Sequence, residues 1–123
     1  MNLLKNMIEN GGERVFIDLN KEIDFGSFDV HEKNHYKRYE FISDFITKLD
    51  PSKNLIVGDF ACGSGYGTCM MSGNSKKVTG IDISETIIEF NQTHYKRFEN
   101  VEFISINIFS LSYHHDFDLI SSF

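Results

Sequence analysis

Three glycines at alternate positions, Gly63, Gly65 and Gly67, lie between a short apolar run and a segment that can form a helix. Glycine is favoured where the chain turns with backbone angles that side chains oppose, and where a ligand approaches the main chain closely. The N-terminus of a helix after such a turn presents unpaired N–H groups to an electronegative ligand. The spacing therefore predicts a ligand-binding turn between a strand and a helix.

An acidic residue, Asp82, ends the next apolar run along the chain. In a parallel sheet the ends of these two strands are neighbours, so the carboxylate is expected beside the glycine turn. There it can accept hydrogen bonds from both hydroxyls of a ribose. The turn and the acid together predict a cofactor that contains adenosine.

The spacing of the glycines separates several kinds of nucleotide site. A dinucleotide fold has the pattern G-x-G-x-x-G, but Thr68 stands where its last glycine would be. A phosphate-binding loop needs a Lys-Ser or Lys-Thr pair after its last glycine, and none follows Gly67. A nucleotide-type Rossmann site and a tight turn without a ligand stay open as alternatives.

The G-x-G-x-G pattern preceded by Asp59 resembles motif I of the class I methyltransferases that depend on S-adenosyl-L-methionine (SAM). The resemblance covers about residues 35–123 and weakens after motif I. It implies that SAM is the cofactor, that Asp59 organises the loop and the methionine amine, and that Asp82 holds the ribose. Further implied contacts are Ala61, Gly63 and Gly65 along the methionine part, Gly67 in the same turn, and Ile83 against the adenine.

Later motifs of that family are matched less closely. The family usually has Asp followed by an apolar residue where this chain has Asn107-Ile108. The Asn oxygen can still accept from the adenine amino group, so both residues are expected at the cofactor. The segment 117–120 looks like the motif of the family's fourth strand.

A finer resemblance is to methyltransferases of sugar and polysaccharide biosynthesis. It rests on Gly12-Glu13-Arg14 and on a helix with His35 and Arg38. The resemblance implies that Arg38 meets the cofactor carboxylate, which suits the fork of a guanidinium. The proline-containing sequence that usually follows Gly-Glu-Arg is absent. Exposed helix positions without a ligand are the alternative for His35 and Arg38.

The elements that must position these residues alternate along the chain. Apolar residues at three- and four-residue steps predict an amphipathic helix from about 35 to 49. Strands are expected near 55–60, 78–82, 101–106 and 117–122, with helices after the glycine turn and from the N-cap Ser84 to about Arg97. This alternation predicts an α/β, Rossmann-like parallel sheet in the order 3-2-1-4, over 35–123 after a lead-in over 1–34.

Composition limits the other classes of protein. The 123 residues suffice for one domain, and the net charge of −6 argues against a generic nucleic-acid binder. With two cysteines, no signal peptide and no apolar run of about 18 residues, we expect a cytoplasmic protein without a membrane span. The adjacent His114 and His115 lack further ligands, so no metal is expected.

The resemblance also implies what the chain lacks. The family's sheet normally has about seven strands in a doubly wound arrangement, and Phe123 falls in or just after the fourth. We therefore expect a truncated fold, unknown catalytic residues, an inactive isolated chain, and self-association or a completing partner at the fourth strand. The acceptor is expected to be a small molecule, with a sugar among the candidates. A non-catalytic SAM-binding or interaction module is the alternative function.

Overall fold

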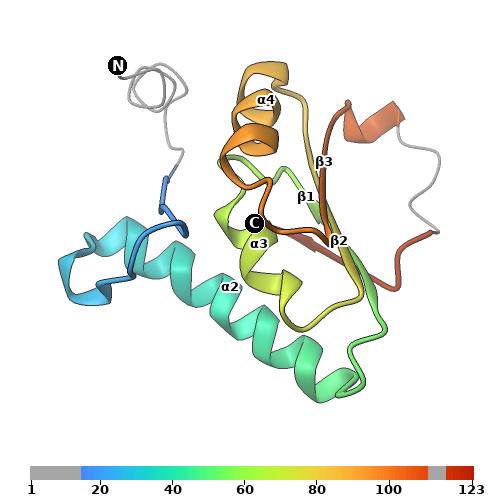
Figure 1. Cartoon of the computed structure of the whole chain (residues 1–123), viewed down its shortest axis with the longest axis horizontal. Coiled ribbons are helices and arrows are strands. Elements are labelled where there is room, and N and C mark those ends of the chain that lie inside the picture. The colour runs from blue at the N-terminus through green and yellow to red at the C-terminus, as the bar shows by residue number, and fades with distance from the viewer. Residues whose placement is uncertain (1–14, 111–115) are drawn as a thin grey trace.

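A computed structural model describes residues 15–110 and 116–123. It shows alternating helices and strands (Figure 1). The helical elements are η1 (Phe25–Ser27), α2 (Val30–Leu49), α3 (Tyr66–Ser72), α4 (Glu85–His94) and η2 (Ile108–Ser110). The strands are β1 (Ile56–Phe60), β2 (Lys77–Asp82), β3 (Val101–Ser105) and β4 (Leu119–Ser122).

The four strands form one sheet in the order β3-β2-β1-β4, with every pairing parallel. The predicted fold class and strand order are confirmed. The register sets Phe60 opposite Ile81, so the end of β1 lies next to the end of β2. The glycine turn and Asp82 therefore meet at the carboxyl edge of the sheet.

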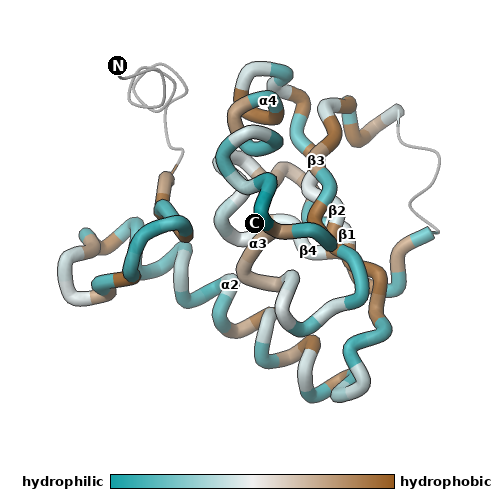
Figure 2. Tube along the Cα trace, viewed as in Figure 1, coloured by the Kyte–Doolittle hydropathy of each residue, from teal (hydrophilic) through white to brown (hydrophobic). Residues whose placement is uncertain are grey.

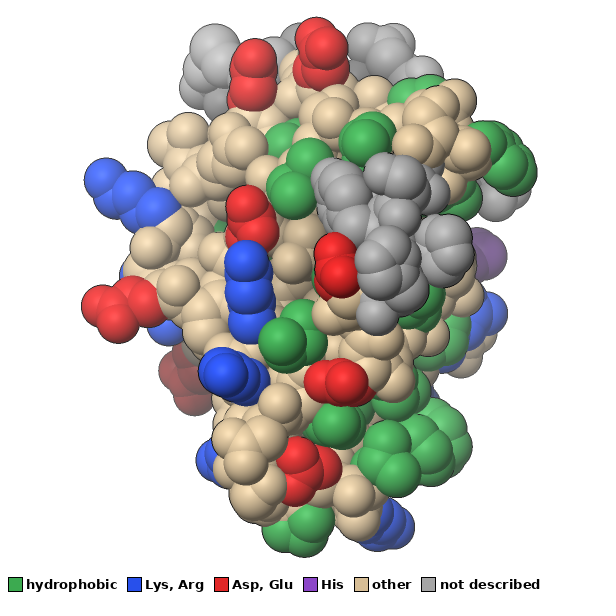
Figure 3. All heavy atoms as spheres, turned by 90° about the vertical axis from the view of Figure 1, so that its right-hand side faces the viewer, with side chains coloured by type: hydrophobic (Ala, Val, Ile, Leu, Met, Phe, Trp, Pro, Cys, Tyr) green, Lys and Arg blue, Asp and Glu red, His purple; other side chains and the backbone are tan. Residues whose placement is uncertain are grey.

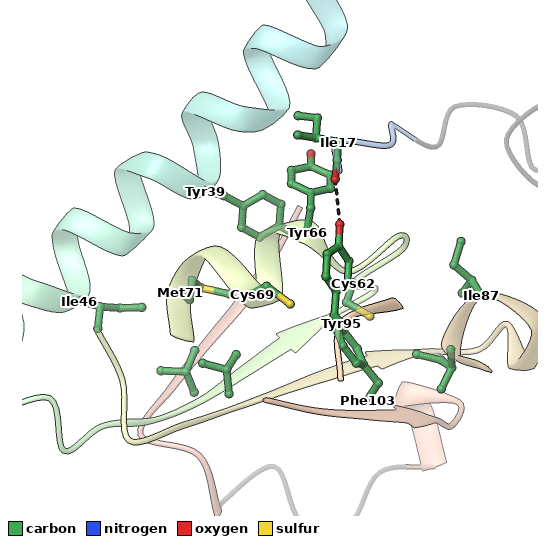
Figure 4. Packing of buried hydrophobic residues seen from close by; sticks show 13 residues of the cluster. Ile17, Tyr39, Ile46, Cys62, Tyr66, Cys69, Met71, Ile87, Tyr95 and Phe103 are labelled. Atoms are coloured by element: carbon green, nitrogen blue, oxygen red, sulfur yellow. Dashed lines mark hydrogen bonds between the residues drawn. The ribbon is translucent and has the colours of Figure 1, made fainter. Parts of the chain in front are cut away.

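The helices α2, α3 and α4 lie on one face of the sheet (Figure 1). Side chains of this face and of the helices form the core, which is drawn in Figure 4. Figure 2 shows hydrophobic residues, in brown, along parts of the strands. Core residues that are almost completely buried include Ile46, Val57, Met71, Val78, Ile87 and Tyr95.

The opposite face of the sheet carries η2 (Figure 1). Figure 3 shows this side of the molecule, where hydrophobic side chains lie in separate groups between charged ones. Ile108, Phe109 and Ile120 are large apolar residues that stay exposed on the chain. Among the described residues, this face therefore packs against fewer helices than the other one.

The helix α2 begins earlier than the apolar periodicity predicts. Asp29 and Glu32 form a capping box, in which each side chain accepts from the other's backbone N–H. This arrangement starts the helix at Val30 instead of near residue 35. Tyr39 and Ile46 of the predicted apolar stripe are buried, whereas Phe45 and Leu49 are exposed.

The described part of the lead-in is hydrogen-bonded to residues at and just after the end of α4. Tyr95 donates from its hydroxyl to the Ile17 carbonyl at 2.9 Å, as the dashed line in Figure 4 shows. Arg97 donates to the Leu19 carbonyl at 2.9 Å, and Asn20 donates to the His94 carbonyl at 2.6 Å. Residues 15–20 of the lead-in thus pack on the domain, while Gly12-Glu13-Arg14 lies outside the described residues.

No helix among the described residues is both long enough and apolar enough to span a membrane.

Candidate functional site

The glycine turn connects β1 to α3 through residues with left-handed backbone angles. Gly63 has a φ of 55° and Gly65 a φ of 82°, conformations that glycine adopts without strain. Ala61 has a φ of 59°, which is uncommon for a residue with a side chain. A Cβ added to Gly63 would meet no atom within 4 Å, so this glycine serves conformation and access and not packing.

The other two glycines have a packing reason for their lack of a side chain. A Cβ on Gly65 would lie 2.8 Å from Asn91, and a Cβ on Gly67 would lie 2.2 Å from the Tyr39 ring. Neither distance is tolerable, so these glycines allow α3 to approach α4 and α2. Their contact with a cofactor, which the resemblance implies, stays a prediction.

Two hollows adjoin the turn, and three residues line both of them. The larger has a volume of about 550 Å³ and the smaller about 210 Å³. Both are lined by Ala61, Asp82 and Ile83. The larger hollow is also lined by Val15, His35, Arg38, Tyr39, Cys62, Gly63, Ser64, Tyr66 and Phe123. The smaller is also lined by Ile106, Asn107, Ile108 and Phe109.

Asp82 lies where the two hollows meet and is itself almost buried. Its Oδ2 accepts from the Gly63 N–H at 2.9 Å, and its Oδ1 accepts from the Ser84 N–H at 3.0 Å. Asp82 therefore fixes the turn at the junction of the two hollows, and its contact with a ribose stays a prediction.

Asp59 lies behind the wall of the hollow and is fully buried. Its carboxylate accepts from Thr68 Oγ1 at 2.8 Å, from Ser121 Oγ at 3.0 Å and from the Tyr39 hydroxyl at 3.2 Å. Burial raises the pKa of Asp59 to about 6, although the three hydroxyl donors favour the charged form. The carboxylate joins α2, α3 and β4 to the end of β1.

Arg38 and His35 face the larger hollow from α2. Arg38 is exposed and His35 is partly buried. Burial lowers the pKa of His35, and the nearby Arg38 cation lowers it further. The structure brings both residues to the same hollow as the glycine turn, and the contact of Arg38 with a cofactor carboxylate stays a prediction.

The predicted adenine residues line the smaller hollow, whose walls are mainly apolar. Ile83 is 68% exposed, so its side chain is available to a ligand. Asn107 Oδ1 accepts from the Phe109 N–H at 2.9 Å, and an amide oxygen can accept two hydrogen bonds. Ile108 lies on the same wall.

Sequence reasoning missed several residues of the site. Phe123, Tyr66 and Ser64 line the larger hollow, and Ser64 Oγ donates to the Val15 carbonyl at 2.7 Å. Asn91 of α4 also contacts the turn. The only sign of it in the sequence was a polar residue on the apolar face of that helix. No group of three or more potential metal ligands occurs among the described residues, but His114 and His115 fall outside them. The expectation of no metal therefore stays a prediction.

The shape and chemistry of this site fit SAM. An apolar slot suits an adenine, the carboxylate of Asp82 at the junction suits a ribose, and a larger hollow with a guanidinium suits a charged amino-acid tail. The open side of Gly63 gives such a ligand access to the main chain.

Comparison with known proteins agrees with this fit. Residues 57–123, just over half of the chain, match the model of a methyltransferase domain family. The chain belongs to that family, and its sheet is that of the class I SAM-dependent methyltransferases. The predicted family is confirmed, and SAM is its cofactor. No curated protein matches the chain.

Solved structures show the same fold. Magnesium protoporphyrin IX methyltransferase from Synechocystis PCC 6803, with bound S-adenosylhomocysteine (SAH), is 18% identical with a TM-score of 0.67, covering 83% of this chain and 47% of that one. The YcgJ protein from Bacillus subtilis is 23% identical with a TM-score of 0.61, covering 72% and 38%. The PH0226 protein from Pyrococcus horikoshii OT3 is 29% identical with a TM-score of 0.57, covering 80% and 47%. This chain thus spans less than half the length of each.

Proposed function

We propose that this chain binds SAM for methyl transfer, with the adenine in the smaller hollow and the methionine in the larger one. The observation that carries this proposal is the junction of the two hollows at Ala61, Asp82 and Ile83. A ligand that crosses the junction places its ribose beside the Asp82 carboxylate. The amino-acid end then lies towards Arg38 and the turn at Gly63.

The residues of this site bind and orient, and the cofactor supplies an electrophilic methyl group when it is bound. Arg38 pairs with the ligand carboxylate, and Asp82 accepts from the ribose hydroxyls. Asn107 accepts from the adenine amino group, while Ile83 and Ile108 exclude water from the ring. Asp59, Gly65 and Gly67 determine the shape of the glycine turn, and that shape is required for these contacts.

For the acceptor we propose a small molecule, with a sugar as one candidate. The net charge of −6 gives no basis for a nucleic-acid partner. We assign no catalytic base, and we propose that the isolated chain transfers methyl groups poorly, because proximity of a bound acceptor supplies much of the rate. A radiolabelled methyl-transfer assay with sugar-nucleotide, small-molecule, protein and RNA acceptors tests this, and multiple turnover by a monomer contradicts it.

A non-catalytic SAM-binding module is the second candidate, and methyl transfer with any acceptor excludes it. We further propose the division into a lead-in over residues 1–34 and a cofactor domain over 35–123. A cytoplasmic location is also proposed, since Cys62 and Cys69 are both free thiols, as a reducing compartment permits.

Calorimetry with the purified chain tests the binding proposal directly. SAM and SAH are expected to bind at one site per chain, and NADH is expected to bind much more weakly or not at all. Binding of NADH tighter than SAM contradicts the cofactor assignment. Saturating SAH should also raise the unfolding temperature, because a ligand that binds only the folded state stabilises it.

A further inference from the structure

Asn91 is a polar residue in the apolar interface between α4 and the sheet. Its side chain is fully buried, on the face of α4 that also buries Ile87 and Ile88. A buried amide costs free energy unless hydrogen bonds compensate for its lost hydration. The burial of apolar surface therefore does not explain why an amide stands at this position. The explanation must lie in its contacts.

The contacts of Asn91 are with the glycine turn. Its Nδ2 donates to the Gly63 carbonyl at 2.7 Å, while the Gly63 N–H donates to Asp82 Oδ2 at 2.9 Å. Both polar groups of the Gly63 backbone are thus held. Because a carbonyl can only accept, the Asn91 amide must turn its nitrogen towards Gly63. Its Oδ1 is then buried, with no hydrogen-bond partner among the described residues.

The same side chain also fills the space beneath Gly65. A Cβ on Gly65 would lie 2.8 Å from Asn91 Cγ, so the amide packs directly against the main chain of the turn. Gly63 lines the larger hollow, whereas Asn91 lies below it. Asn91 thus contacts the turn without lining either hollow.

We propose that Asn91 is a positioning residue for the cofactor. It draws the Gly63 carbonyl towards the protein interior and so holds the wall of the hollow in its binding conformation before the ligand arrives. A wall that is already ordered lowers the entropic cost of binding. This role rests on the proposed function, because it assumes that the hollow beside Gly63 receives SAM.

The variant Asn91→Leu tests the role, since leucine has a similar shape but no donor, and it removes the unpartnered Oδ1. Asn91→Ala answers the same question if leucine is not accommodated beneath Gly65. Asn100→Ala is the matched control. Asn100 Nδ2 also holds main-chain carbonyls, those of Ser72 at 2.8 Å and Ser75 at 3.2 Å, but in a turn that does not line either hollow.

Three readouts are measured on the whole chain: the affinity for SAH by calorimetry, hydrogen exchange of the Gly63 and Gly65 amides by NMR, and the midpoint of urea unfolding. For Asn91→Leu we expect SAH to bind about tenfold more weakly or worse, the loss of roughly one hydrogen bond, and both amides to exchange faster. Its unfolding midpoint should stay near that of the wild type. Asn100→Ala should lower the midpoint and leave the affinity and these two amides unchanged.

Unchanged affinity and unchanged exchange in both Asn91 variants would overturn the inference. An affinity loss in Asn100→Ala equal to that in Asn91→Leu would also overturn it, because general destabilisation would then explain both. If the wild type binds neither SAM nor SAH while Asn91→Leu still speeds exchange at Gly63, the proposed function fails and the anchoring of the turn by Asn91 stands.

Discussion

Some residues at this site have more than one role, and Asp82 is the clearest example. The resemblance assigns it to the ribose, and the structure adds hydrogen bonds from the Gly63 and Ser84 N–H groups. Asp82→Ala removes all of these acceptors together. We expect SAH affinity to fall by more than about tenfold and the free energy of unfolding to fall by about 1–3 kcal/mol.

Calorimetry and urea unfolding measure the two effects of Asp82→Ala. Glu85→Gln is the control, because Glu85 lies in the first turn of α4 and does not line either hollow. Undiminished SAH binding by Asp82→Ala would remove this residue from the site. A loss of affinity without a loss of stability would mean that the backbone bonds of Asp82 contribute little.

Asp59 shows what a motif cannot reveal about a residue. The pattern identified it beside the glycine turn, but its full burial depends on Tyr39, Thr68 and Ser121 from three other elements. Contacts between residues so far apart in the sequence are set by tertiary packing, so no local signal contains them. The same holds for Asn91, for which the sequence offered only an amide on an apolar helix face.

The raised pKa of Asp59 predicts a pH dependence of stability. Burial raises its pKa from 3.8 to about 6, so between these values the folded chain binds more protons than the unfolded chain. The contribution of Asp59 is therefore fully present below about pH 4 and is lost as the pH rises through about 6. The loss corresponds to about 3 kcal/mol at most.

Urea unfolding of the wild type and of Asp59→Asn between pH 4 and pH 7 measures this dependence. The variant cannot titrate at this position, so the difference between the two unfolding free energies isolates Asp59. We expect the wild type to lose stability relative to the variant as the pH rises. A difference that is constant over this range, or that changes in the opposite direction, would contradict the raised pKa.

At the scale of elements, the sequence located each strand within a residue or two. Apolar runs with turn signals mark strands directly, and the expected N-cap Ser84 does accept from the Ile87 N–H at 3.3 Å. The start of α2 was missed because a capping box of Asp29 and Glu32 lies before the apolar periodicity begins. Capping depends on local polar geometry and not on the hydrophobic pattern that was used to place the helix.

The packing of α3 against α2 gives a prediction at this scale. In Gly67→Ala the new Cβ would lie 2.2 Å from the Tyr39 ring, whose hydroxyl is tied to Asp59. Tyr39 cannot move away without breaking that bond, so we expect a loss of about 1–3 kcal/mol, typical of an overpacked core. Gly73→Ala is the control, since its Cβ would meet nothing within 4 Å.

Thermal and urea unfolding compare the two glycine variants under identical conditions. Gly73→Ala should change the unfolding free energy by no more than about 0.5 kcal/mol. Equal stabilities for Gly67→Ala and Gly73→Ala would show that α2 can shift to accept a methyl group, and the close approach of the two helices would then not need glycine.

For the whole molecule, the strand order followed from alternation and from the right-handed crossover rule, which together leave few topologies. The same rules do not say which face of the sheet stays uncovered. In the described residues α2, α3 and α4 all lie on one face, and the other face bears η2 (Figure 1). How much of a face is covered depends on the lengths of the connections, which periodicity does not encode.

The open side of β4 gives the last prediction, that the chain associates with itself or with a partner. β4 pairs with β1 and stands at the edge of the sheet. Its Ser121 donates to Asp59 on the helix side, so the alternating pleat turns Ile120 to the opposite face, where it is 43% exposed. An apolar edge strand of this kind favours pairing with another chain.

Sedimentation over a range of concentrations measures this association. The wild type should form larger species as its concentration rises, and Ile120→Lys should reduce them, because a charge on an edge strand opposes strand pairing. Val30→Lys is the matched control, since Val30 is an apolar residue that is 70% exposed at the start of α2, away from β4. A wild type that stays monomeric throughout would contradict the prediction. If both lysine variants reduced the association equally, total charge, and not the edge of β4, would control it.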